Sequence, residues 1–338
     1  MLMVILGAGA SFDSAPSAPP ANKQFDNIRM PLADSLFESR DWFSNIMNTY
    51  SMMIPIVPKL RAAGTSKTVE KVLEEYQAAS RGDPAAHQQL VAVRFYLQHM
   101  IRECQDRWTS QVSYGITNYA ALFDRIRVLD GLREPVCLVT FNYDTMIESA
   151  LAFSYPPIKE MSDYVSGQQF KLFKLHGSTD WGRKINHSFL SGPQSDKEFA
   201  EKIGRLTPPI PLTGVYYRTT SHYEGDYPLF PAIAIPVQTK LESDFECPTD
   251  HLAYLKSFLP KITKILIIGW RAAEDHFFKM VSEAVKHRIR VMAVCGETKE
   301  ADATLDRLRK HIDLEGFAMP GGFTKFINDD EGESFLRN

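Results

Sequence analysis

The sequence contains few cysteines, and they stand far apart in the chain. The four thiols are Cys104, Cys137, Cys247 and Cys295, and no two of them form a C-x-x-C pair. Because structural zinc sites and disulfide frameworks need paired or clustered cysteines, neither is expected. Isolated thiols suit a reducing compartment, so we predict a cytoplasmic protein that requires no metal.

Long hydrophobic runs and an excess of basic residues are also missing. The apolar start "MLMVIL" lacks a basic residue and stops at Gly7, which fits a buried strand better than a signal peptide. No run approaches the ~18 apolar residues that a membrane-spanning helix needs. The formal net charge is −3, from 38 basic and 41 acidic residues, which is not the footprint of a nucleic-acid-binding protein. We therefore expect neither membrane insertion nor direct nucleic-acid binding.

Short apolar runs followed by helical patterns are the main feature that is present. The runs are rich in Val, Ile and Leu and end in glycine or a polar turn, which indicates buried parallel strands. They lie at Leu2–Leu6, Val136–Phe141, Ile265–Ile268 and Arg290–Val294, with a shorter candidate at Lys171–Leu175. Helical patterns follow at Thr145–Phe153, Ala273–Lys286 and Lys299–Arg309. This alternation predicts an α/β fold with a Rossmann-like doubly wound parallel sheet, in a single domain that spans residues 1–338.

Two regions depart from this alternation. Residues from about 35 to 119 carry no good strand signal, and apolar residues recur there at helical spacing, for example in "PAAHQQLVAVRFYLQHMIRECQDRW". We interpret this region as a helical insertion between the first and second strands. Residues from about 183 to 230 are rich in turn-forming residues, and we interpret them as an irregular loop region.

The first chemical motif is "VILGAGAS", residues Val4–Ser11. A strand that runs into Gly-Ala-Gly-Ala-Ser forms a tight turn whose backbone N–H groups suit a pyrophosphate. The dehydrogenase fingerprint G-x-G-x-x-G is broken, because Phe12 stands at the third glycine position. No helix clearly follows, since "DSAPSAPP" has the composition of a loop. A tight strand-to-loop turn without a ligand is the alternative interpretation.

The second motif is "TFNYDT", where Asn142 and Asp144 follow directly on a predicted strand. Polar residues at strand ends of open α/β sheets point into the crevice where ligands bind. Both residue types also cap helices and stabilise turns, so Asp144 has an ordinary structural explanation as well. The two roles are compatible, because a cap needs only one carboxylate oxygen.

Further candidates stand at the ends of the other predicted strands. His176 precedes a glycine in "LHGSTD", and an unperturbed imidazole titrates near neutrality, which suits proton transfer. A structural histidine is the alternative. Two more strand-to-glycine turns contain Gly269 with Trp270 and Gly296 with Glu297. Such turns permit close approach of a nucleotide, and ordinary βα turns are the alternative interpretation.

The order of these motifs, G-A-G-A-S, then T-x-N-x-D, then H-G, resembles the sirtuin family. The resemblance implies that NAD is the substrate and that the first turn holds its pyrophosphate. It implies that Asn142 and Asp144 lie beside the nicotinamide ribose and carboxamide, and that His176 acts on the ribose hydroxyls. The positions expected to contact NAD are Gly7, Ala8, Gly9, Ala10, Ser11, Asp13, Thr140, Phe141, Gly269, Trp270, Gly296 and Glu297.

Two departures from the sirtuin pattern restrict the resemblance to one branch of that family. Sirtuin deacylases carry a four-cysteine zinc module, which this chain cannot build, and "FDSAPSAPP" stands where that family has G-I-P-D-F-R. The sequence is more similar to bacterial sirtuin-like proteins of antiphage defence, which share G-A-G-x-S, F-N-Y-D and L-H-G, lack the zinc module and consume NAD. The segment Pro231–Lys240 also looks like a proline-rich strand of that branch.

This resemblance implies an NAD⁺ glycohydrolase that releases nicotinamide and ADP-ribose and acts by abortive infection. It further implies a homo-oligomer that is inactive until a protein partner, such as a motor ATPase or an Argonaute-type protein, or a phage-derived trigger activates it. An NAD or ADP-ribose sensor without turnover is one alternative, and a protein deacylase or ADP-ribosyltransferase is another. A dehydrogenase fits least, because the third glycine is missing.

Overall fold

The computed structural model describes residues 1–62, 68–129, 134–167, 169–186, 195–224, 227–237 and 245–337. Its centre is a six-stranded sheet in the order β10-β9-β8-β1-β2-β3, in which every neighbouring pair is parallel. The strands are β1 (Leu2–Leu6), β2 (Val136–Thr140), β3 (Phe170–Lys174), β8 (Lys264–Ile268), β9 (Ile289–Cys295) and β10 (Leu314–Pro320). The predicted doubly wound parallel sheet is confirmed. Strand β10 is an addition that the sequence patterns did not indicate.

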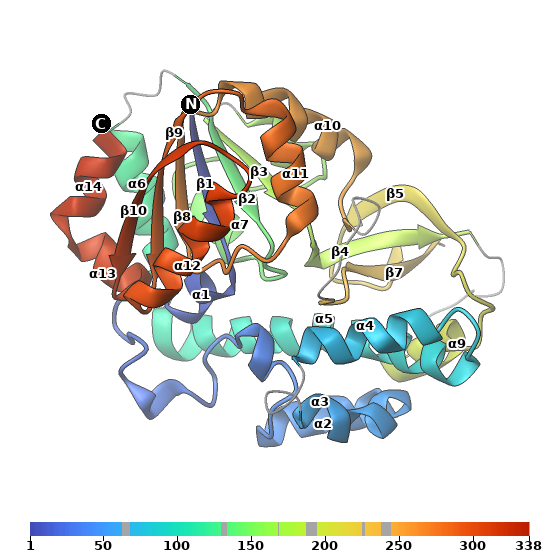
Figure 1. Ribbon diagram of the computed structural model, residues 1–338. Coiled ribbons are helices and arrows are strands. Elements are labelled where there is room, and N and C mark those ends of the chain that lie inside the picture. Colours follow the sequence, from blue (N-terminus) through green and yellow to red (C-terminus); the bar gives the residue numbers. More distant parts are fainter. Residues whose placement is uncertain are drawn as a thin grey trace.

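The strand order also identifies the point where the chain stops adding strands on one side of β1 and continues on the other side, which we call the reversal of the sheet. From β1 the chain proceeds to β2 and β3 on one side, and β8, β9 and β10 continue on the other side. Helix α6 (Asn118–Leu129) packs against both α7 (Met146–Leu151) and α14 (Asp330–Arg337), whereas α12 (Thr298–Arg309) packs on β9 and β10 (Figure 1). Sheets of this kind bind ligands at the carboxyl ends of the strands beside such a reversal, which here are β1 and β8.

The region interpreted as a helical insertion consists of helices and turns in its described part. Its long helix α5 (Pro84–Trp108) runs beneath both sheets in Figure 1. Pro84 suits the first helical position, and the Asp83 side chain accepts a hydrogen bond from the Ala85 N–H at 2.9 Å. The shorter elements are η2 (Ala33–Ser35), α2 (Asp41–Thr49), η3 (Ser51–Ile56), α3 (Val57–Arg61), α4 (Val69–Ala79) and η4 (Thr109–Ser113).

The interpretation of residues 183–230 as an irregular loop region is wrong for the residues that the structure describes. An antiparallel sheet in the order β5-β4-β7-β6 is formed by β4 (Gly177–Ile185), β5 (Leu212–Arg218), β6 (Tyr223–Glu224) and β7 (Tyr227–Ile233), with α9 (Asp196–Gly204) beside it. Strand β7 contains Pro228 and Pro231, which cannot donate ladder hydrogen bonds and therefore conceal a strand in the sequence. Residues 187–194 and 225–226, and residues 238–240 of the segment Pro231–Lys240, lie outside the described part.

The remaining elements are short or peripheral. They are α1 (Ala8–Phe12), η1 (Lys23–Phe25), α8 (Asp163–Ser166), α10 (Thr249–Phe258), η6 (Leu259–Lys261), α11 (Asp275–Ala284) and α13 (Gly322–Asn328).

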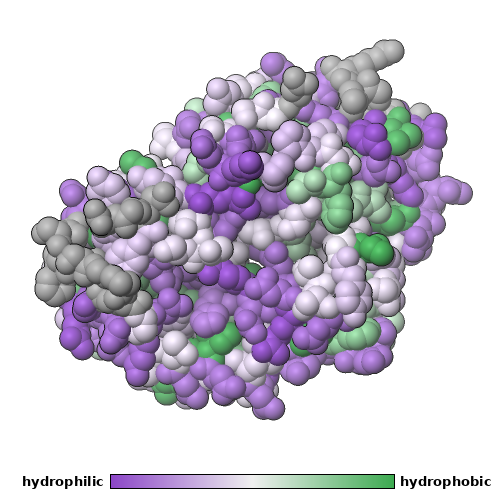
Figure 2. Space-filling model, turned by 180° about the vertical axis from the view of Figure 1, so that it is seen from behind, coloured by the Kyte–Doolittle hydropathy of each residue, from purple (hydrophilic) through white to green (hydrophobic). Residues whose placement is uncertain are grey.

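Among the described helices, none combines the length and the apolar character that a membrane crossing requires. Seen from behind, hydrophobic residues form small separate groups among hydrophilic ones (Figure 2). This face is therefore largely polar.

Candidate active site

The glycine turn after β1 packs tightly against the turn after β8. A Cβ atom on Gly7 would lie 2.5 Å from the Gly269 carbonyl oxygen, and one on Gly9 would lie 2.7 Å from the Gly269 Cα. Gly269 itself has φ of +62°, a conformation that favours glycine. Close backbone packing at the point where the sheet reverses is thus one physical reason for these glycines.

This turn differs from the expected open pyrophosphate cradle. Helix α1 begins at Ala8, although no helix was expected there. The Gly9 N–H donates to the Gly269 oxygen at 2.9 Å, and the Ala10 N–H donates to the Gly7 oxygen at 2.9 Å. These two donors already have partners within the protein, so a pyrophosphate at this turn would depend on other donors.

Ser11, Asn142 and Asp144 form one buried polar network. The Ser11 hydroxyl donates to Asp144 Oδ2 at 2.7 Å, and Asn142 Nδ2 donates to the Ser11 Oγ at 2.9 Å and to the Gly7 oxygen at 2.8 Å. The structure therefore brings the first and second sequence motifs into direct contact. Because both N–H groups of Asn142 are used, its amide can offer a substrate only the acceptor Oδ1.

A fourth member of this network, Tyr119, was not identified from the sequence. Its hydroxyl lies 2.9 Å from the Ser11 Oγ. Ser11 has a single hydroxyl proton and donates it to Asp144, so Tyr119 must be the donor in this pair. Complete burial raises the pKa of Tyr119 well above its usual value, which keeps the phenol protonated for this donation. Tyr119 lies within an ordinary helical pattern, and no local motif marks it.

Asp144 also has the structural role that was its alternative explanation. Its Oδ1 accepts a hydrogen bond from the Met146 N–H at 3.1 Å, at the start of α7. Its backbone oxygen accepts one from the buried ammonium group of Lys174, which pairs with Glu148 at 2.8 Å. Burial raises the pKa of Glu148, while Lys174 opposes that shift. The carboxylate of Asp144 therefore holds both Ser11 and the first turn of α7.

Aromatic rings surround His176. The ring of Phe141 meets the imidazole of His176 edge to face, with 5.0 Å between the ring centroids. The same Phe141 ring stacks on Trp270, with 5.0 Å between the centroids and 6° between the two ring planes. Gly177, with φ of +80°, turns the chain from β3 into β4, and a Cβ there would lie 1.9 Å from the Ala232 oxygen. His176, Phe141 and Trp270, which come from three different strand ends, thus meet in one cluster.

The other predicted positions serve the scaffold or lie apart. The Thr140 hydroxyl donates to the Leu6 oxygen at 2.9 Å and so joins β2 to β1. Asp13 accepts hydrogen bonds from the Thr324 N–H at 2.9 Å and the Thr324 hydroxyl at 2.6 Å, at the start of α13. Burial raises the pKa of Asp13. Gly296 and Glu297 are exposed after β9, at the same sheet edge but two strands away from β1.

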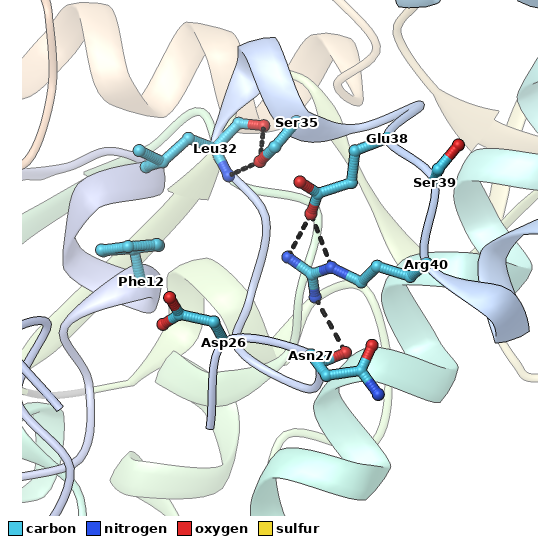
Figure 3. A pocket seen from close by; sticks show the side chains of 8 residues that line it. All are labelled: Phe12, Asp26, Asn27, Leu32, Ser35, Glu38, Ser39 and Arg40. Atoms are coloured by element: carbon cyan, nitrogen blue, oxygen red, sulfur yellow. Dashed lines mark hydrogen bonds and ion pairs between the residues drawn. The ribbon is translucent and has the colours of Figure 1, made fainter. Parts of the chain in front are cut away.

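The candidate catalytic side chains are nearly inaccessible. Asn142 is 6% exposed, and Asp144 and His176 are each 3% exposed. A cavity of about 460 Å³ follows the glycine turn in the sequence; it is lined by Phe12, Asp26, Asn27, Leu32, Ser35, Glu38, Ser39 and Arg40 (Figure 3). The buried Arg29 holds this segment, because its guanidinium donates to the oxygens of Phe12 and Ala18, each at 3.0 Å. No candidate catalytic side chain lines this cavity.

The described residues contain no group of three or more His, Cys, Asp or Glu side chains that could hold a metal ion. All four cysteines are free and buried. Burial raises the pKa of Cys295 to about 11, so this thiol is protonated at neutral pH.

Comparison with known proteins finds likeness in structure only. No family model and no curated protein matches the sequence. A Sir2 homologue in complex with NAD is 13% identical with a TM-score of 0.39, covering 99% of this chain and 89% of that chain. A point mutant of a Sir2 homologue, in complex with ADP-ribose, is 14% identical with a TM-score of 0.41, covering 99% and 91%. Sir2Tm bound to a propionylated peptide is 12% identical with a TM-score of 0.39, covering 99% and 94%.

Proposed function

We propose that the protein is an NAD⁺ glycohydrolase that cleaves NAD to nicotinamide and ADP-ribose. The observation that carries the proposal is the direct contact of Gly7 and Ser11 with Asn142, in a network that includes Asp144. This network stands at the carboxyl edge of β1 and β2, beside the reversal of the sheet. Residues of two sequence motifs that resemble NAD-binding motifs thus share one site.

The proposed reaction requires a water molecule that is positioned beside the ribose carbon. The C–N bond between ribose and nicotinamide breaks, and its electron pair leaves with the ring, which becomes neutral nicotinamide. The water oxygen bonds to the ribose carbon, and the displaced proton goes to His176. Asn142 Oδ1 accepts a hydrogen bond from this water, and the carboxylate of Asp144 stabilises the positive charge that develops on the ribose.

NAD turnover by purified protein tests the proposal. Nicotinamide and ADP-ribose are separated by chromatography after incubation with NAD. We expect Asn142→Ala and His176→Ala each to lower kcat by at least ~10²-fold, because each removes positioning or proton transfer. Asn45→Ala and His311→Ala, at exposed positions, are matched controls that should leave kcat unchanged. Undiminished turnover in both Asn142→Ala and His176→Ala would contradict the proposed NAD⁺ glycohydrolase activity at this site.

We infer further that the enzyme is an effector of antiphage defence that is inactive until triggered. The 3–6% exposure of the candidate catalytic side chains supports a closed resting site. The trigger would be a phage component or a partner protein, such as a motor ATPase or an Argonaute-type protein, acting on a homo-oligomer in the cytoplasm. The test is cellular NAD before and after phage infection, together with the mass of the protein in solution. NAD that stays constant during infection would contradict this role.

A sensor that binds NAD without turnover is the second candidate. Both carboxylate oxygens of Asp144 already accept hydrogen bonds, from Ser11 and Met146, which favours a scaffold role for this residue. Calorimetry with NAD measures binding, and chromatography measures the release of nicotinamide. Binding of NAD without release of nicotinamide, also after addition of extract from infected or uninfected cells, supports the sensor.

A further inference from the structure

Helix α5 carries a row of polar side chains toward the two loops that hold the candidate catalytic residues. Gln98, Arg102 and Gln105 follow one another at spacings of four and three residues, which places them on one face of the helix. The helix packs on β4 and β7, and Figure 1 shows it passing beneath the junction of the two sheets.

Gln105 holds the residue that follows Asp144. Its Nε2 donates to the Thr145 Oγ1 at 2.8 Å, and its Oε1 accepts a hydrogen bond from the Thr145 N–H at 2.7 Å. Thr145 is the N-cap residue of α7, and its own side chain makes no capping hydrogen bond. One glutamine side chain therefore holds the backbone and the hydroxyl of Thr145, next to the candidate site.

Gln98 and Arg102 hold the start of β4, on the other side of the site. Gln98 Nε2 donates to the Thr179 oxygen at 3.0 Å, and the Arg102 guanidinium donates to the same oxygen. Thr179 lies three residues after His176, and its N–H donates to the Tyr143 oxygen at 2.8 Å. Helix α5, the 142–145 loop and the start of β4 directly after His176 are thus joined to one another by hydrogen bonds.

We propose that Gln98, Arg102 and Gln105 are positioning residues that set the spacing between Asn142 and His176. This inference rests on the proposed NAD hydrolysis, in which Asn142 orients the water and His176 takes its proton. Two groups on separate loops can act on one water only if both loops keep their separation. The helical insertion is therefore part of the catalytic framework.

Gln105→Leu tests this inference, because leucine approximates the size of glutamine without its hydrogen bonds. We expect kcat for NAD to fall about tenfold, since the 142–145 loop loses its alignment with His176. KM should stay within about twofold, because the glycine turn after β1 is unchanged. Amide hydrogen exchange in residues 143–147 should become faster, and exchange in β8 and β9 should stay unchanged. Glu103→Gln is the matched control: it removes an exposed ion pair with Arg107 on the same helix and should alter neither reading.

Thr145→Val is a milder second variant, for use where Gln105→Leu does not fold. It removes only the hydroxyl that Gln105 Nε2 contacts, so the expected loss of kcat is about threefold. The double variant should be no worse than Gln105→Leu alone, because both changes act on one contact.

Wild-type kcat and unchanged loop exchange in Gln105→Leu would overturn the inference. Failure of the proposed function looks different, since wild-type protein would then release no nicotinamide under any condition. The exchange comparison between Gln105→Leu and Glu103→Gln still decides, in that case, whether α5 holds the two loops.

Discussion

The central strands of the parallel sheet and the edge strand β5 of the antiparallel sheet differ in how they are buried. Strands β1, β2 and β8 of the parallel sheet are buried along almost their whole length, whereas β5 of the antiparallel sheet is half-exposed or exposed throughout. A strand buried on both faces needs a continuous apolar run, which is easy to find in a sequence. A half-buried strand needs only partial alternation, and turn residues within it obscure the pattern.

The comparison also separates two contributions to the candidate site. The parallel sheet supplies the ends of β1, β2 and β8, where Gly7, Asn142 and Trp270 stand. The antiparallel sheet begins at Gly177, directly after His176. The proposed chemistry therefore depends on the junction between the sheets, and three sets of variants test the two halves and this junction.

The largest effect is expected from the buried ion pair in the parallel half. Lys174 and Glu148 are 0% and 3% exposed, so Glu148→Ala leaves an uncompensated buried charge and should cost about 3–5 kcal/mol of unfolding free energy. In the antiparallel half, Arg183→Met breaks the partly exposed Arg183–Glu246 pair and should cost about 1 kcal/mol. Urea unfolding measures both, and similar losses would contradict the contrast.

The second effect concerns two glycines of the antiparallel half, one at the junction with the parallel sheet and one in β5. Gly177→Ala forces a Cβ to 1.9 Å from the Ala232 oxygen at φ of +80°, so we expect a loss of about 2–3 kcal/mol, measured by thermal or urea unfolding. Gly214→Ala in β5 is the control, because nothing lies within 4 Å of its Cβ. That change should be neutral or slightly stabilising. A neutral Gly177→Ala would show that the junction tolerates a shift of the backbone.

The smallest effect is a pH dependence from Asp13, where the parallel half meets α13. Burial raises the pKa of Asp13 above its ordinary value of 3.8, so the folded protein retains this proton to higher pH than the unfolded chain. Stability from this group is present at low pH and decreases as the pH rises through the interval above 3.8, by at most ~1.4 kcal/mol per pH unit.

Asp13→Asn should remove this dependence, and exposed Asp313→Asn should not. Unfolding free energies between about pH 3.5 and 6 measure it. If wild type and Asp13→Asn show the same slope against pH, Asp13 does not titrate as its burial indicates.

Sequence patterns predicted four core strands because each contains a continuous apolar run, and they indicated β3 less clearly because Lys171 and Lys174 interrupt it. They also predicted the three following helices to within a few residues. They did not reveal β10, in which Glu315 and Gly316 interrupt the apolar run. They also missed the antiparallel sheet, where Pro228 and Pro231 stand in β7. At the candidate site, local motifs marked Ser11, Asn142 and Asp144, but no motif marked Tyr119, Lys174 or Gln105.

The order of apolar runs and polar strand ends thus determined the parallel sheet and the residues along its carboxyl edge. This is possible because a strand buried between two helical layers has one simple composition, and the residue after it necessarily stands at the edge. Tertiary structure alone decided which of those residues touch, since Ser11 and Asn142 are 131 residues apart and meet only through strand pairing. It also decided that Tyr119 and Gln105 reach the site, because helix packing brings distant side chains together without leaving a local pattern.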